Sequence, residues 1–338
     1  MIMVRSEILL IEDIDIYVIS LYINILRNYL ILIQDDNLYL LTENDNNILV
    51  TLIMNIFNKN KNNEPIIIEL LQLIDIKNND EYFIKLLINN NLSKILFSIF
   101  SPFSEESNNN NNNNNNNYSQ CIIPALNTIY DLLKYNFFII ELLNIGINNI
   151  INCLYHYIFN SKICEIFLKI ILKIIENKEH INMLINKINL SDVKKIVINI
   201  LDKYLDTCHK HLIKYSLEII EFFIESPNNL INFSKSNDKN NTLLITCLFK
   251  CININYEETY IMDNSIKILF RYISYVKINK EKSRVNLLEN KVDEDDDDDL
   301  PDDLFSEEYP QVLKIFKCQY FKQFIDIYLI KIKIMNQL

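Results

Sequence analysis

The most informative part of the sequence is the stretch from Ala125 to Leu154, ALNTIYDLLKYNFFIIELLNIGINNIINCL, which contains the only glycine among 338 residues. Its apolar residues recur at three- and four-residue intervals, the spacing that places them on one face of a helix. They fall into three groups, which are Ala125, Ile129, Leu132 and Leu133, then Ile139, Ile140, Leu142 and Leu143, then Ile147, Ile150, Ile151 and Leu154. A polar patch at 134–136 separates the first two groups. The stretch therefore predicts a long helix, a short helix and another long helix.

Gly146 stands between the short helix and the last one. A helix often ends in the left-handed conformation, which is easy for glycine, tolerable for asparagine and strained for other residues. We therefore expect Gly146 to end the short helix in that conformation and to form a corner before the next helix.

The same spacing recurs elsewhere in the chain. Asn91 precedes an apolar group with the offsets that Gly146 has to its own group, and Asn47 and Asp192 precede similar groups. The expected corner residues, Asn47, Asn91, Gly146 and Asp192, are 44, 55 and 46 residues apart. The longest interval contains ten consecutive asparagines at 108–117, and its length without them is 45. The sequence therefore predicts a repeat of about 45 residues.

Around this corner the stretch resembles an armadillo repeat, whose pattern runs A-L-x-x-L-x-N-L, then a short helix, then E-x-G-x-I-x-x-L. The matching residues here are Ala125, Leu126, Ile129 and Leu132, followed by Gly146, Ile147, Ile150, Ile151 and Leu154. Asp131 departs from the pattern, because the family usually has asparagine there. The resemblance implies an all-α fold, a right-handed α-solenoid of about five to six degenerate armadillo-like repeats. HEAT repeats have a similar period, and an unrelated helical bundle with one capping glycine is a further alternative.

We expect three parts in the chain. The armadillo-like solenoid would cover residues 1–284, interrupted by a disordered asparagine-rich insert at 104–119. A disordered acidic segment would follow at 285–310, and capping helices would close the chain at 311–338. We interpret the asparagine run as a tolerated insertion between two repeats, with self-association as the alternative.

The acidic segment has its highest charge at 293–308, DEDDDDDLPDDLFSEE, which contains eleven acidic residues and no basic one. The whole chain has 44 acidic and 33 basic residues, so this segment accounts for the net charge of −11. It is a solubilising loop, a segment that folds back on the chain's own basic surface, or an arm that recruits a basic protein. For the arm, the candidate binding residues are Asp295, Asp297, Leu304 and Phe305.

A single glycine excludes the standard phosphate-binding loop, the dinucleotide fingerprint, the kinase glycine loop and the nucleophile elbow. The one cluster with metal-binding residue types is Cys208, His209 and His211, with Cys247 and Cys251 further along. On a helix the two histidines would face different sides, so we interpret the cluster as a polar turn and not as a zinc site. We expect no enzyme activity, no cofactor and no metal.

The seven cysteines have mostly apolar neighbours and no dense pairing, which is typical of buried thiols in a reducing compartment. The N-terminus carries Glu7, Glu12 and Asp13 and lacks the pattern of a signal peptide. The longest uncharged interval outside the asparagine tract, 142–161, is too polar for a membrane span. We therefore expect a soluble protein of the cytoplasm, and of the nucleus as well, with no membrane partner.

We expect the protein to be a scaffold or adaptor that binds a protein partner on the concave face of the helical array. In armadillo proteins the third helix of each repeat lines this face. Six residues after each alanine-type anchor, where the family's asparagine would fall, the chain has Leu26, Asp131, Asn177, Phe222 and Arg271. Because this is no asparagine ladder, and because the chain has no tryptophan, we expect a folded partner or an apolar helix and not a basic peptide.

The candidate partner-binding residues on the array are accordingly Asp131, Asn177, Phe222 and Arg271. The alternative function is an acidic-arm chaperone or a chromatin-type binder of basic proteins. We expect no nucleic-acid binding, because the basic patches at 194–195 and 277–284 are small and the chain is acidic overall.

Overall fold

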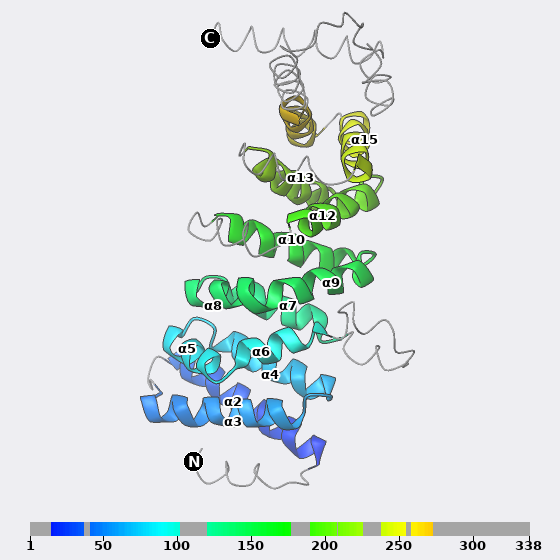
Figure 1. The fold of residues 1–338 in the computed structure, drawn as a ribbon. Coiled ribbons are helices and arrows are strands. Elements are labelled where there is room, and N and C mark those ends of the chain that lie inside the picture. Colours follow the sequence, from blue (N-terminus) through cyan, green and yellow to red (C-terminus); the bar gives the residue numbers. More distant parts are fainter. Residues whose placement is uncertain are drawn as a thin grey trace, which may run out of the picture. The chain divides into compact units, whose positions relative to one another are not determined.

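The structure is a computed structural model, and it describes residues 15–36, 41–101, 120–176, 190–207, 209–225, 238–254 and 258–272. Within these ranges all regular secondary structure is helical (Figure 1), which confirms the prediction of an all-α protein. The chain divides into two compact units, Met1–Ile273 and Ser274–Leu338, and every described residue belongs to the first. The expected asparagine-rich insert, acidic segment and capping helices lie outside the described residues.

Short segments rich in polar residues separate many of the labelled helices. They are α2 (Ile16–Asp36), α3 (Glu43–Lys59), α4 (Glu64–Ile76), α5 (Glu81–Asn89), α6 (Leu92–Ser98), α7 (Ile122–Leu132), α8 (Asn136–Glu141), the π-helix η4 (Leu142–Gly146), α9 (Ile147–Tyr157), α10 (Ser161–Glu176), α12 (Leu190–Tyr204), α13 (Lys210–Glu225) and α15 (Asp238–Ile254). Residues 259–272 are also helical.

Short polar side chains fix where several helices begin. Thr42 and Asp45 form a capping box at the start of α3, in which each side chain accepts a hydrogen bond from the backbone N–H of the other residue. Asn63 caps α4, which has Pro65 in its first turn, and Asp80 caps α5. These caps satisfy backbone N–H groups that have no partner inside the helix.

The helices contact one another in two series. In the first series α2 packs on α4, α4 on α7, α7 on α10 and α10 on α13. In the second series α6 packs on η4, which continues directly into α9, and α9 packs on α12 and α12 on α15. Contacts of α3 with α4, α9 with α10 and α12 with α13 join the two series, and Figure 1 lets the reader follow both.

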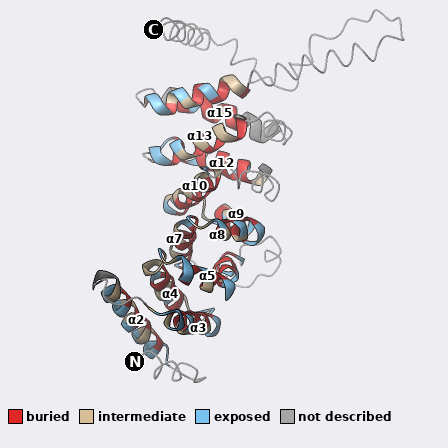
Figure 2. Ribbon diagram, turned by 90° about the vertical axis from the view of Figure 1, so that its left-hand side faces the viewer, coloured by how far each residue is buried: buried red, intermediate tan, exposed pale blue. Residues whose placement is uncertain are grey.

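The core lies between these series and consists mainly of isoleucine, leucine and phenylalanine. Figure 2 shows the buried residues along the helices, with exposed residues on other sides of the same helices. Phe57, Phe83, Phe97, Phe138 and Phe167 are among the largest side chains that are fully buried. Burial of one such side chain contributes roughly 1.5–3 kcal/mol, so packing between successive helices is the main source of stability.

The expectation for Gly146 is wrong. Its φ of −100° and ψ of −29° lie in the right-handed region, and α8, η4 and α9 follow one another without a break. The position requires glycine for a different reason. A Cβ atom at Gly146 would lie 2.4 Å from ring atoms of Phe97 in α6, closer than van der Waals contact allows. The missing side chain makes room for a ring; it does not permit a corner.

Of the three other expected corners, Asn47 and Asp192 are also wrong, whereas Asn91 does adopt the left-handed backbone conformation. Asn47 lies inside α3, because the capping box at Thr42 starts that helix earlier. Asp192 lies in the first turn of α12, where a negative charge favours the helix N-terminus. Asn91, with φ of 72° and ψ of 25°, precedes α6 and is the only non-glycine residue with positive φ among those the structure describes.

Two helical stretches in the described ranges are long and apolar enough to cross a membrane by length and composition alone. They are Ile16–Ile33 and Asn136–Tyr157, of which 22% and 56% are buried. The second packs inside the helical stack, as core helices of soluble proteins do. Sequence reasoning overlooked the first, although it contains a single charged residue, Arg27, and it judged the interval 142–161, which overlaps the second, too polar for a span.

Candidate binding surface

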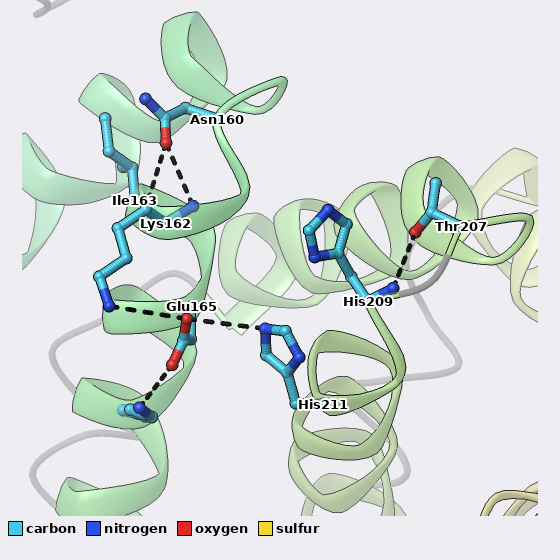
Figure 3. Close-up of polar contacts among 8 residues, drawn as sticks. Asn160, Lys162, Ile163, Glu165, Thr207, His209 and His211 are labelled. Atoms are coloured by element: carbon cyan, nitrogen blue, oxygen red, sulfur yellow. Dashed lines mark hydrogen bonds and ion pairs between the residues drawn. The ribbon is translucent and has the colours of Figure 1, made fainter.

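Polar side chains of the first helix series meet across successive helices. Glu165 of α10 accepts a 2.6 Å hydrogen bond from Nζ of Lys169, one turn along the same helix. Its other carboxylate oxygen lies 3.6 Å from Nε2 of His211, on α13 (Figure 3). Glu165 and His211 are 46 residues apart in the sequence, close to the repeat length of about 45 residues that the sequence predicts.

Local caps hold both sides of this contact in place. The side-chain oxygen of Asn160 accepts hydrogen bonds from the backbone N–H groups of Lys162 and Ile163 at the start of α10. At the start of α13, the backbone N–H of His209 donates to the hydroxyl of Thr207 at 3.4 Å (Figure 3). Glu165 thus lies in the second turn of a helix that Asn160 caps, and His211 lies in the first turn of α13.

The charges at this contact stabilise each other. The hydrogen bond from Lys169 holds the pKa of Glu165 below its usual range, and the same bond raises the pKa of Lys169. The ammonium group of Lys169 also lies 5.9 Å from the ring centroid of Tyr215 on α13, within the range of a cation–π contact. A carboxylate with a lowered pKa stays ionised at neutral pH, so Glu165 is suited to electrostatic recognition.

The same kind of contact continues from α13 to the helix at 259–272. The Tyr260 hydroxyl donates a 2.5 Å hydrogen bond to Glu218, and Nζ of Lys214 lies 4.8 Å from the Tyr260 ring centroid. Burial and the Glu218 hydrogen bond raise the pKa of Tyr260 to about 12, so its hydroxyl stays protonated. One helical turn further on, Glu221 pairs with Lys267 and Arg271.

Between α4 and α7 the contact is more buried and more acidic. The Thr128 hydroxyl donates a 2.9 Å hydrogen bond to Asp75, and the Asn78 amide donates to Asp131 at 3.4 Å. Burial raises the pKa of Asp75 to about 6, and the neighbouring Asp131 carboxylate adds to the shift. Burial also raises the pKa of Asp131. Asp75 therefore binds a proton more tightly in the folded protein than an ordinary aspartate does.

Together these side chains form a surface that we call the polar strip. It combines three glutamates with lysines, an arginine, a histidine and two tyrosines on α10, α13 and 259–272. Its members are Glu165, Lys169, His211, Lys214, Tyr215, Glu218, Glu221, Tyr260, Lys267 and Arg271. All are exposed or half-buried, so the strip is accessible to another molecule.

The residues expected to bind a partner have different surroundings. Arg271 belongs to the polar strip, and Asp131 is half-buried in the contact with α4. Phe222 is half-buried, with its ring centroid 5.6 Å from that of Phe223, and Leu26 is buried. The remaining candidates, Asn177, Asp295, Asp297, Leu304 and Phe305, lie outside the described residues.

Sequence reasoning missed most of the polar strip, because it followed only the apolar register. A signal was present. Lys169 and Lys214 are 45 residues apart, and so are Glu176 and Glu221. The period of about 45 residues that the apolar residues predict therefore recurs in charged residues as well.

The histidines of the histidine and cysteine cluster lie at the turn between α12 and α13 and at the start of α13. His209 precedes α13, and its ring meets the His211 ring edge-on with centroids 5.7 Å apart. Cys247 and Cys251 are buried on α15, while Cys208 lies outside the described residues. In the described part of the chain, no group of three or more histidine, cysteine, aspartate or glutamate side chains is placed to hold a metal ion.

The cysteines that the structure describes are small core residues, as expected. Cys121, Cys153, Cys164, Cys247 and Cys251 are all free and buried. Burial raises the pKa of Cys153 to about 12, and it raises the pKa of the other four thiols as well. A thiol that stays protonated is a poor nucleophile and a poor metal ligand.

No protein-family model, no curated protein and no solved structure matches this chain. The polar strip is therefore interpreted from its own residues and contacts.

Proposed function

We propose that the chain is a non-enzymatic scaffold that binds a protein partner through the polar strip. We further propose that its helices form a right-handed solenoid of armadillo-like repeats, in which the first series lines the concave face. The contact between Glu165 and His211 carries this proposal, because it joins side chains of α10 and α13 whose separation in the sequence is close to the predicted repeat length. The contact between Glu218 and Tyr260 extends the same pattern to 259–272.

The composition of the polar strip favours a protein as the partner. Tyrosine and arginine are enriched in protein interfaces, and tyrosine contributes a large rigid surface with a polar end. The charges of the strip already pair with one another, so little ordering is needed when a partner binds. Both signs of charge are present, which suits a folded partner of mixed charge better than a uniformly basic peptide.

The same contacts disfavour a catalytic role. General acid catalysis by a carboxyl group at neutral pH requires a raised pKa, whereas Lys169 lowers the pKa of Glu165. The Tyr260 hydroxyl is engaged with Glu218 and holds its proton more tightly than a free tyrosine does. The protonation states of Glu165 and Tyr260 therefore suit binding better than proton transfer.

The experiment that tests the proposal compares two matched double variants of the full chain. Lys214→Ala with Tyr260→Ala removes a lysine–tyrosine contact of 4.8 Å from the polar strip. Lys195→Ala with Tyr155→Ala removes a similar contact of 5.5 Å between α12 and α9, in the second series. Each cation–π contact contributes roughly 0.5–1 kcal/mol, so both variants should remain folded, as circular dichroism melting would verify.

Partners are then captured from cell extract on each variant and quantified by mass spectrometry. We expect the polar-strip variant to lose its specific partners at least about tenfold, as for an interface tyrosine, and the second-series variant to retain them. Equal retention by both variants would refute the polar strip as the binding surface. Equal loss would show that the effect is not specific to it.

A further inference from the structure

Helix α2 has two apolar faces. The first consists of Ile19, Ile23, Leu26 and Leu30, which are buried in the contact with α4. The second is exposed. Its members include Val18, Leu21, Ile25 and Leu32, whose exposed fractions are 44%, 52%, 43% and 62%. At 100° per residue the two sets point to nearly opposite sides of the helix. A helix that is apolar on opposite sides normally has a neighbour on both.

The exposed face has the spacing of a coiled coil. Val18, Leu21, Ile25, Asn28 and Leu32 follow one another at intervals of three, four, three and four residues, and all five are exposed. In the sequence, Ile11 and Ile14 continue the same alternation toward the N-terminus. The pattern thus spans three heptads and places β-branched residues at most a positions, which favours two-stranded pairing. We call Val18, Leu21, Ile25, Asn28 and Leu32 the α2 seam.

The position of α2 in the fold leaves the seam uncovered. Within the described residues α2 is the first helix of the first series, and its neighbour in that series is α4. The α2 seam carries no charge at all, since the one charged side chain of Ile16–Ile33, Arg27, donates to Gln72 on α4 at 2.9 Å.

We propose that the α2 seam is the interface with a second copy of this chain, which dimerises through paired α2 helices. An uncharged apolar seam is complementary to itself, as the two-fold symmetry of a homodimer requires. Asn28 would lie opposite its counterpart, and a single polar residue inside an apolar seam fixes the register of such a pair. The helix has 21 residues and is about 31 Å long, so the seam extends over most of one side of it.

Crossing a membrane would require α2 to leave its present packing. Ser20 donates a 2.5 Å hydrogen bond to Glu69, and Arg27 is bound to Gln72, so two polar contacts besides the buried face hold α2 on α4. Pairing with a second copy keeps all of these contacts and covers only the exposed side.

The experiment measures the mass of the full chain in solution by light scattering after gel filtration, over a dilution series into the low micromolar range. We expect a dimer, with twice the 40.2 kDa of one chain. Ile25→Glu places a charge at the centre of the seam, and we expect it to weaken dimerisation at least about 100-fold and to yield a monomer. The matched control is Ile16→Glu, at another exposed isoleucine of α2 that lies on a different side of the helix from the seam; it should remain dimeric.

Circular dichroism establishes that both variants are folded before their masses are compared. A wild-type chain that is monomeric throughout the series would overturn the proposal, as would a dimer that Ile25→Glu leaves intact. The second result would mean that another segment mediates the dimer, such as the asparagine run at 108–117. The wild-type monomer could instead float with neutral phosphatidylcholine vesicles while the Ile25→Glu variant does not. This result would show that the seam binds a lipid surface, and it would also overturn the proposal. A monomer whose melting temperature falls when residues 1–14 are deleted would show that the chain covers its own seam.

Discussion

Gly146 and Phe97 are mutually dependent, because the space that a side chain at Gly146 would need is occupied by the ring of Phe97. The Cδ1 and Cε1 atoms of the ring both lie 2.4 Å from the position of a Cβ at Gly146. The ring is buried and has Phe138 as a neighbour, with centroids 6.2 Å apart. The contact joins α6 to η4 and explains why the single glycine of the chain is found at a position with an ordinary helical φ.

Gly146→Ala should therefore destabilise the protein. In an open helix this change stabilises by up to about 1 kcal/mol, but here the new methyl group must displace a packed ring, which costs roughly 1–3 kcal/mol. Urea unfolding would measure the change. Asn148→Ala, at an exposed position one half-turn away, is the control and should be neutral or stabilising. The combination of Gly146→Ala with Phe97→Leu should be less destabilising than the sum of the two single changes, and strict additivity would show that the two residues are independent.

Asn91 should tolerate glycine and reject alanine. Its φ of 72° is strained for a side chain with a Cβ, so Asn91→Ala should cost about 1 kcal/mol, while Asn91→Gly should be close to neutral. Thermal melting would measure both. Asn47→Ala tests the contrasting position inside α3, where alanine is the better helix former and should not destabilise. If Asn91→Ala melted at the wild-type temperature, the left-handed conformation at Asn91 would be refuted.

Asp75 should make the protein more stable at pH 5 than at pH 7. Its folded pKa of about 6 is above the ordinary value of 3.8, so the folded state binds the proton more tightly than the unfolded state. The contribution of this group is therefore present at low pH and is lost as pH rises from about 4 to about 6. Between pH 7 and pH 5 the gain should be about 1 kcal/mol.

The variant Asp75→Asn isolates this effect, because its amide oxygen can still accept the Thr128 hydrogen bond but the group cannot ionise. We expect Asp75→Asn to be more stable than the wild type at pH 7, and the difference to shrink by about 1 kcal/mol at pH 5. Urea unfolding at the two pH values measures it. Asp206→Asn, at an exposed position after α12, serves as the control. A difference that does not change with pH would contradict the assignment.

Deletion of Asp293–Glu308 should leave partner binding in place. If the polar strip is the binding surface, the same partners should be recovered with the deletion variant, and their binding should fall only moderately with salt. Affinity purification of the two full-length forms, followed by mass spectrometry at low and high salt, makes the comparison. Loss of the partners together with the segment would favour the acidic-arm function, in which Asp295, Asp297, Leu304 and Phe305 recruit a basic protein.

The sequence alone determined that the protein is helical and which apolar stretches form several of its helices. The intervals of three and four between apolar residues identify α7, α9 and α6 with little error, because a helix must turn one face toward its neighbours. Short polar residues such as Thr42 and Asp80 mark helix starts in the structure, because their side chains satisfy backbone N–H groups, although the sequence analysis identified neither of them. These are local effects, and a sequence records local effects directly.

Only the tertiary structure decided what the exceptional residues do. Glycine serves equally for a left-handed turn and for the close approach of another side chain, and the sequence does not distinguish these uses at Gly146. The contact between Glu165 and His211 and the exposure of the α2 seam likewise depend on which helices become neighbours. Periodicity shows which face of a helix is apolar. It takes the packing of the helices to determine which apolar faces are covered and which remain open.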